Sequence, residues 1–302
     1  ILLFRTYQKL LTTYVNALPL LIDKKDKKIH TTFNQTVTNT GRLSSSAPNL
    51  QNIPIRKFSG KEVRRSFIAS PGHILMAADY SQIELRLIAE LSEEKTMIEA
   101  FLNNEDIHTS TASKVFKVDL DQVTANMRLS AKTVNFGIIY GVSAFGLSEQ
   151  STLNRKEAAE IIKTYFATYP DLKLFIDNQI DFARENGYVK TILGRRRYLR
   201  NINSRNTFIR AHDERNAVNM PIQGSAADLI KLAMINIEKE LNKLKLKSKM
   251  VLQVHDELVF DVLIEEKEIV QKVVEKKMEN VYDSNVPLKV DVGFGANWLD
   301  AH

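Results

Sequence analysis

The sequence predicts an α+β fold in which a long helical segment interrupts an antiparallel sheet. Strand-like apolar runs lie towards both ends of the chain, at His73 to Ala78 and at Met250 to Val262. Between them, from about Ser92 to Tyr198, apolar residues recur mainly at helical intervals. Strands and helices are thus segregated along the chain rather than alternating, which favours α+β over a parallel α/β sheet.

The first elements follow from apolar spacing. Residues 1–18 carry apolar side chains at helical intervals until Pro19, which is expected to end the helix. The Thr-rich stretch Ile29 to Thr40 favours strands. His73 to Ala78 has the length of a buried strand, and helical spacing begins directly after it. Asp79 is therefore predicted at a strand-to-helix junction.

The later elements are marked by turn residues. Breaks in the helical segment are predicted at Gly141, Gly146, Pro170, Gly187 and Gly194. A further helix is predicted over Ala226 to Leu241. Met250 to Val254 and Leu258 to Val262 then predict a hairpin with His255 to Glu257 at its tip, and Val286 to Val292 predicts a last strand.

Composition narrows the class of protein. The 302 residues are 44% hydrophobic, and 42 Lys and Arg against 36 Asp and Glu give a net charge of +6, which mildly favours a polyanionic partner. No apolar run reaches the roughly 18 to 20 residues that span a bilayer, so no membrane partner is expected. The absence of cysteine excludes disulfides, thiolate zinc sites and a cysteine nucleophile. The start at Ile1 indicates a piece of a longer protein.

Four side chains share one predicted helix face. Arg128, Lys132, Phe136 and Tyr140 recur every four residues, and each step drifts only about 40° around a helix. Two cations followed by two aromatics suit a triphosphate at one end and a base at the other. By spacing alone the favoured alternative is an amphipathic helix with aromatic core residues and solvated cations.

Two aspartates each stand at the end of a strand-like run. Asp79 and Asp256 could project carboxylates from rigid edges and bind Mg²⁺ for phosphoryl transfer. Spacing alone does not bring them together, and taken singly each is better explained as a turn or helix-cap acid.

Three segments resemble motifs A, B and C of family A (DNA polymerase I type) DNA polymerases, in the correct order: residues 79–86 (DYSQIELR), 128–141 (RLSAKTVNFGIIYG) and 253–257 (QVHDE). Other segments resemble further parts of the family: residues 40–45, 48–54, 106–108 and 215–228. The similarity spans essentially the whole chain. The final residues, 295–302, resemble the family's C-terminal end.

The resemblance implies a right-hand polymerase with an antiparallel-sheet palm, helical fingers and most of the thumb missing. The implied division is a thumb-helix remnant at 1–22, palm at 23–80, fingers at 81–205 and palm again at 206–302. A monomer is expected, in the cytoplasm with the nucleoid, of bacterial or organellar origin. Without most of the thumb, DNA binding should be weak and salt-sensitive. No exonuclease segment, and so no proofreading, is expected in this chain.

The implied function is template-directed DNA polymerase activity in replication and repair, with deoxynucleotides added to a primer 3′ end by two-metal-ion nucleotidyl transfer. Two Mg²⁺ ions are implied, held by Asp79, Asp256 and the backbone carbonyl of Tyr80. Glu257 has a supporting catalytic role. Glu84 matches the steric gate against a 2′-hydroxyl. The implied nucleotide-binding residues are Gln82, Glu84, His108, Arg128, Lys132, Phe136 and Tyr140. The implied primer-template contacts are Arg42, Arg215, Asn219, Gln223 and His255.

Two rival functions remain at this point. A single-subunit RNA polymerase shares the metal aspartates and the Lys-bearing helix, although Glu84 and the His-Asp-Glu triplet argue against it. A DNA-binding module without catalysis is the rival from another class, since a fragment can keep its site and still fail to hold a primer end. Mg²⁺-dependent primer extension distinguishes the enzyme from the module.

Overall fold

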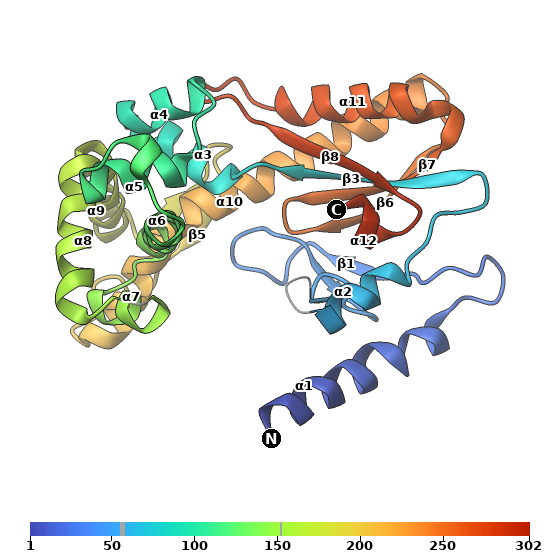
Figure 1. The fold of residues 1–302 in the computed structure, drawn as a ribbon, viewed down its shortest axis with the longest axis horizontal. Helices are drawn as coiled ribbons and strands as arrows, with labels where there is room; N and C mark the ends of the chain where they lie inside the picture. The colour runs from blue at the N-terminus through green and yellow to red at the C-terminus, as the bar shows by residue number, and fades with distance from the viewer. Residues whose placement is uncertain (55–57, 152) are drawn as a thin grey trace. The chain divides into compact units, whose positions relative to one another are not determined.

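The computed structural model describes residues 1–54, 58–151 and 153–302. These residues fall into two units, drawn in Figure 1. The first unit comprises Ile1–Ser81, Leu229–Val281 and Lys289–His302, and the second comprises Gln82–Asp228 and Tyr282–Leu288. In the described part of the chain no helix combines the length and the apolar composition needed to cross a bilayer.

A four-stranded antiparallel sheet forms the centre of the first unit, with the strand order β6-β7-β3-β8. Its strands are β3 (His73–Tyr80), β6 (Lys249–Val254), β7 (Glu257–Leu263) and β8 (Val290–Gly295). The predicted strand before Asp79 and the predicted hairpin are confirmed. The predicted last strand begins later than expected, at Val290, because the amide of Val286 bonds to Glu90 and the carbonyl of Pro287 bonds to Arg86 in the second unit.

The two faces of β3 pack against different helices. Tyr80 donates its hydroxyl proton to the carbonyl of Met278 in α11 (Lys267–Glu279). On the other face, Leu75 and Ala77 join the apolar core around Trp298, in the short helix α12 (Trp298–Ala301). Side chains alternate along a strand, so Asp79 belongs to the face that α12 covers.

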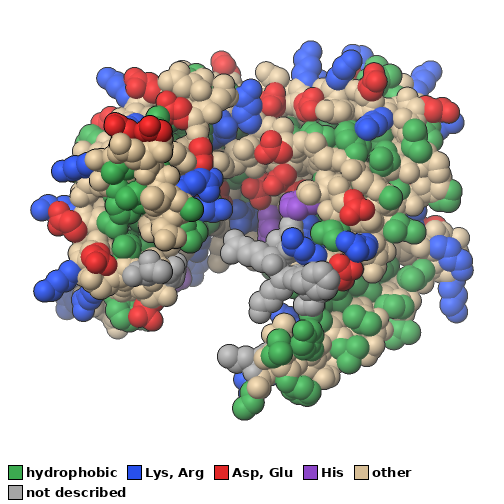
Figure 2. Space-filling model, viewed as in Figure 1, with side chains coloured by type: hydrophobic (Ala, Val, Ile, Leu, Met, Phe, Trp, Pro, Cys, Tyr) green, Lys and Arg blue, Asp and Glu red, His purple; other side chains and the backbone are tan. Residues whose placement is uncertain are grey.

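The first unit also contains smaller elements. They are α1 (Leu2–Leu10), the π-helical turn η1 (Leu11–Val15), the 3₁₀ turn η2 (Leu18–Leu21), the paired strands β1 (Thr32–Asn34) and β2 (Ser44–Ser46), α2 (Phe58–Arg65) and the 3₁₀ turn η4 (Ile264–Glu266). The first helix and its π-helical turn end before Pro19, which lies in the first positions of the 3₁₀ turn η2. Hydrophobic side chains crowd the visible surface of α1 in Figure 2, since Leu3, Phe4 and Tyr7 are exposed.

The second unit is mostly helical, as predicted. It contains α3 (Ile83–Ser92), α4 (Lys95–Leu102), α5 (Ile107–Phe116), η3 (Leu120–Gln122), α6 (Ala125–Ile139), α7 (Ala144–Gln150), α8 (Arg155–Thr168), α9 (Pro170–Asn186) and the hairpin β4 (Tyr188–Lys190) with β5 (Arg196–Tyr198). The predicted break at Gly146 is wrong: Ser143 caps α7 and accepts the amide proton of Gly146, which lies in its first turn.

The longest helix, α10 (Thr207–Lys243), runs from the second unit into the first. The sequence predicted only its second half. Pro221 lies inside α10. Because proline lacks the amide proton that a helix interior needs, the local pattern did not predict the helical turns that precede it. The hydroxyl of Ser225 donates to the carbonyl of Pro221.

Candidate active site

Adjacent strand ends bring Asp79 and Asp256 together in the first unit. In the antiparallel pair β3-β7, Asp79 is directly opposite Glu257. The amide of Tyr80 donates to the carbonyl of Asp256 at 3.3 Å. His255 takes a left-handed conformation with φ of 56°, which makes the tight turn between β6 and β7. The hairpin tip therefore presents Asp256 beside the end of β3.

These two carboxyl groups lie in an electrostatically unfavourable environment. Burial, reinforced by the negative charges of Asp256 and Glu257, raises the pKa of Asp79 to about 7. Burial also raises the pKa of Asp256, although Arg42 and His255 oppose the shift. Two half-buried carboxylates that repel each other are the groups that a divalent cation would stabilise. The residues present therefore fit a hard cation.

The available carboxylate ligands suit Mg²⁺ better than a metal ion whose ligands all come from the protein. Among the described residues, no three His, Cys, Asp or Glu side chains are grouped so that they could hold a metal. Mg²⁺ is commonly bound through one or two carboxylates together with waters and substrate phosphates. Asp79 and Asp256 supply the two carboxylates of such a site.

Glu257, the third acid, has its own partners. The indole N–H of Trp298 donates to Oε1 at 2.8 Å, and Arg64 and His302 each place a nitrogen 3.5 Å from Oε2. These neighbours outweigh burial and hold the pKa of Glu257 below its usual value, while the hydrogen bond to Glu257 raises the pKa of His302. Both carboxylate oxygens of Glu257 therefore already have partners within the protein. A carboxylate that binds a metal ion would instead need an oxygen available for the ion.

In the second unit, the predicted helical stripe lies on α6. Thr124 begins the helix by accepting the amide proton of Met127. Arg128, Lys132 and Tyr140 are exposed and Phe136 is half-buried. The buried side of α6 consists of Ala131, Val134, Asn135 and Ile138. The alternative in which Tyr140 belongs to the core is therefore wrong.

The segment before α5 meets the cationic end of this stripe. The Nε of Arg128 donates to Asp106 at 2.5 Å, and Asp106 also caps α5 by accepting the amide proton of His108. The rings of His108 and Phe136 lie 5.7 Å apart. His108 is 3% exposed. The short segment Asp106 to His108 thus contacts Arg128 through its carboxylate and Phe136 through its imidazole.

The aromatic end of the stripe meets α3. The hydroxyl of Tyr140 donates to the carboxylate of Glu84 at 2.8 Å. Gln82 precedes α3 in a left-handed conformation, and its side-chain oxygen is buried with no hydrogen-bond partner among the described residues. Such an acceptor costs free energy unless a ligand supplies a donor.

Three predicted DNA contacts lie on one face of α10. Arg215, Asn219 and Gln223 are spaced four residues apart within this helix. A Cβ added to Gly141 would lie 2.8 Å from the side chain of Arg215, so the turn after α6 packs closely on α10. In the described part of the chain, the side-chain oxygen of Asn219 is another buried acceptor without a partner.

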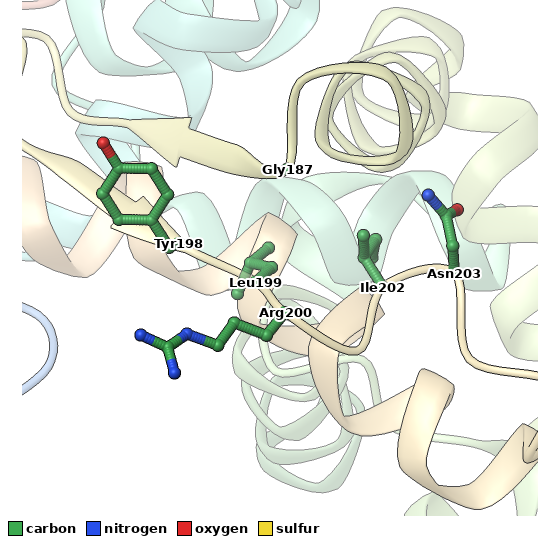
Figure 3. Close-up of a pocket in the computed structure, with 6 residues that line it drawn as sticks. All are labelled: Gly187, Tyr198, Leu199, Arg200, Ile202 and Asn203. Carbon is green, nitrogen blue, oxygen red and sulfur yellow. The ribbon is translucent and has the colours of Figure 1, made fainter.

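The predicted site residues divide between the two units. Asp79, Tyr80, Asp256 and Glu257 lie in the first unit with Arg42 and His255, and all the other predicted site residues lie in the second. A pocket of about 400 Å³ in the second unit contains none of them. Figure 3 draws its lining residues, with Tyr198 and Arg200 at the left of the view and Asn203 at the right.

The sequence analysis missed the residues that support the predicted ones. Arg64, Trp298 and His302 surround Glu257, and Asp106 and Asn135 contact Arg128 and His108. Two sequence features could have pointed to these residues: the single tryptophan near the end of the chain and the cap residue before α5. Neither feature identifies a contact partner that is distant in the sequence.

Three comparisons relate the chain to known proteins. A family model described as DNA polymerase family A matches residues 1–300. The DNA polymerase I of Caldicellulosiruptor bescii is 51% identical over 300 residues, covering 99% of this chain and 35% of the relative. That of Geobacillus stearothermophilus is 49% identical over 302 residues, covering 100% of this chain and 34% of the relative. The chain thus spans about a third of these relatives.

A solved structure has the same fold. The POL domain of Pol1 from M. smegmatis, in complex with DNA primer-template and dNTP, superposes with a TM-score of 0.95 at 44% sequence identity. The match covers 99% of this chain and 53% of that one. The antiparallel sheet and helical second unit predicted for a right-hand polymerase are confirmed.

Proposed function

Because the chain belongs to DNA polymerase family A, we propose that it is the catalytic part of a template-directed DNA polymerase acting in replication and repair. The supporting observation is the adjacent, half-buried pair Asp79 and Asp256, whose pKa values are raised by partial burial and by nearby negative charge. In this proposal residues 1–22 are a thumb-helix remnant, 23–80 and 206–302 form the palm, and 81–205 form the fingers. The protein acts as a monomer in the cytoplasm, with the nucleoid, and is of bacterial or organellar origin.

The palm residues would hold the reacting groups. Asp79, Asp256 and the carbonyl of Tyr80 are the proposed ligands of two Mg²⁺ ions. When bound, such ions favour deprotonation of the primer hydroxyl and neutralise charge on the leaving pyrophosphate. The primer 3′ oxygen forms a bond to the α-phosphorus, and the bond from that phosphorus to pyrophosphate breaks. Glu257 orients the hairpin tip through its own partners.

The fingers residues would bind and select the nucleotide. Arg128 and Lys132 offer cations to the triphosphate, and Gln82 and His108 offer further polar contacts. Phe136 packs on the sugar and Tyr140 lies at the template junction. Glu84, held by the hydroxyl of Tyr140, fills the space that a 2′-hydroxyl would need.

The remaining predicted residues would read the primer end. Arg42, Arg215, Asn219, Gln223 and His255 are proposed to contact the minor groove of the primer-template. Acceptors there are common to all correct base pairs, so these contacts check pair geometry rather than sequence.

Primer extension tests the proposal. A labelled primer on a longer template should be extended with Mg²⁺ and deoxynucleotides, and not with EDTA. Ribonucleotides should be incorporated far less efficiently, and a preference for them would favour the RNA polymerase rival. A gel shift of the primer-template without any extension would favour a binding module and contradict the proposal.

A further inference from the structure

The buried polar side chains of Asn135, Thr111 and Tyr169 form a hydrogen-bonded chain that ends at Nδ1 of His108. The amide nitrogen of Asn135 lies 3.0 Å from Nδ1 of His108. The same amide group contacts the hydroxyl of Thr111 at 3.2 Å through its nitrogen and at 3.3 Å through its oxygen. The hydroxyl of Thr111 lies 3.0 Å from that of Tyr169. Asn135, Thr111 and Tyr169 are each 0% exposed, so water does not compete for these bonds.

This arrangement, with the amide nitrogen of Asn135 facing Nδ1, favours one tautomer of the ring. An amide nitrogen can only donate, so Nδ1 of His108 accepts and carries no proton. Burial lowers the pKa of His108 to about 4; Asp106 opposes the shift, and the Lys132 and Arg128 cations add to it. The imidazole is therefore neutral at neutral pH, with its only ring proton on Nε2.

We propose that Asn135 is a positioning residue, which holds His108 in the Nε2–H tautomer so that a neutral donor faces the triphosphate beside Arg128 and Lys132. This inference rests on the proposed function, since a triphosphate is the ligand. The opposite tautomer would present a lone pair to a phosphate oxygen and repel it. Thr111 and Tyr169 act one step further back, because they hold the Asn135 amide.

The tautomer can be measured without any catalysis. Nitrogen chemical shifts of the histidine rings in ¹⁵N-labelled protein distinguish the two tautomers and the imidazolium, and the variant His108→Gln assigns the signal. We expect an unprotonated Nδ1 and a protonated Nε2 at pH 7. A protonated Nδ1 in the wild-type protein would overturn the inference.

Two substitutions then test the role of Asn135. A carboxylate only accepts, so Asn135→Asp should move the proton to Nδ1 and weaken dNTP binding at pH 8.5 by at least about tenfold, the factor for a lost hydrogen bond to a charged group. Asn135→Ala imposes neither tautomer, so it should weaken dNTP binding less, although it removes more packing. A merely structural role predicts the reverse order. Thermal unfolding identifies any variant that fails to fold.

A double-mutant cycle separates this inference from the proposed function. If Asn135 acts through His108, Asn135→Asp should change the dNTP dissociation constant little when His108 is already Gln. An undiminished effect in that background, or wild-type affinity in the single variant, would overturn the inference alone. Failure of the wild-type protein to bind any dNTP would instead contradict the proposed function.

Discussion

Glu257 keeps a negative charge in a buried position because donors surround it. Its closest donor is the indole N–H of Trp298, at 2.8 Å. Trp298→Phe keeps most of the aromatic packing but leaves one carboxylate oxygen without its donor. We expect the free energy of unfolding to fall by about 1–3 kcal/mol, measured by urea denaturation. An unchanged midpoint and slope would show that the bond contributes nothing.

Asp261 illustrates a pH-dependent contribution to stability. Burial raises its pKa, but hydrogen bonds from the hydroxyl and amide of Ser70, with the charge of Lys28, outweigh that effect and lower it. A lowered native pKa stabilises the fold above the unfolded value of about 3.9, and this stability is lost as the pH falls through the native pKa.

The variant Asp261→Asn tests this contribution. At pH 7 it should be less stable than the wild-type protein by about 1–3 kcal/mol, the scale for a buried charged hydrogen bond. The difference should shrink as the pH falls below about 4. Urea unfolding at several pH values measures it, and a difference that is constant with pH would contradict the assignment.

In the proposed function Glu84 is the gate against a 2′-hydroxyl, so sugar selection should depend on how firmly Glu84 is held. Tyr140→Phe removes the hydroxyl that donates to its carboxylate and leaves the ring. We expect ribonucleotide incorporation to rise by up to about tenfold, the equivalent of one hydrogen bond to a charged group. Competition between ribo- and deoxynucleotides measures this, with Glu84→Ala as the reference for complete loss of the gate. Unchanged selectivity would mean that Glu84 is held by other contacts.

At the scale of elements, the sequence predicted the strands better than the helix boundaries. Asp79 follows a short apolar run bounded by a turn, and the structure places it as the next-to-last residue of β3, which ends at Tyr80. The hairpin around Asp256 was predictable for the same reason, because its two strands are neighbours in the sequence. By contrast, Gly146 and Pro221 lie inside helices, because a cap and the long continuation of α10 override their local preference.

Two glycines of β8, Gly293 and Gly295, allow the backbone of α12 to lie close to the strand. A Cβ on Gly293 would lie 2.3 Å from the carbonyl oxygen of Ala301, which is backbone and cannot rotate away. Gly293→Ala should therefore destabilise the protein by at least about 1–3 kcal/mol, the usual scale of overpacking.

Gly72→Ala is the matched control. Gly72 has a positive φ but no atom within 4 Å of an added Cβ, so only backbone strain of about 1–2 kcal/mol is expected. Thermal or urea unfolding compares the two variants. Equal stability of the Gly293 variant and the wild-type protein would contradict the close packing.

At the scale of the whole molecule, the site could be predicted only in part. Spacing placed Asp79 and Asp256 at strand ends, but only the motif resemblance implied that they meet. The contacts of Arg64, Trp298 and His302 with Glu257 were not predictable, because these residues are distant from Glu257 in the sequence and reach it through tertiary packing. Local patterns predict elements, whereas contacts between distant segments need the fold or a known relative.

The net charge of +6 predicts how the molecule responds to salt. If binding to primer-template depends on phosphate contacts, the logarithm of the affinity should fall linearly with the logarithm of the salt concentration, by roughly 0.9 for each phosphate neutralised. Fluorescence anisotropy at several salt concentrations measures the slope. Affinity that does not change with salt would contradict an electrostatic interface.

The most direct test compares three acids of the first unit in single-turnover primer extension. Asp79→Asn and Asp256→Asn should each slow incorporation by at least about a hundredfold, the scale for losing a group that stabilises transition-state charge. Asp291 is directly opposite Asp79 on β8 and is exposed, so Asp291→Asn should stay close to the wild-type rate. Near-wild-type extension by either of the first two variants would contradict the proposed active site.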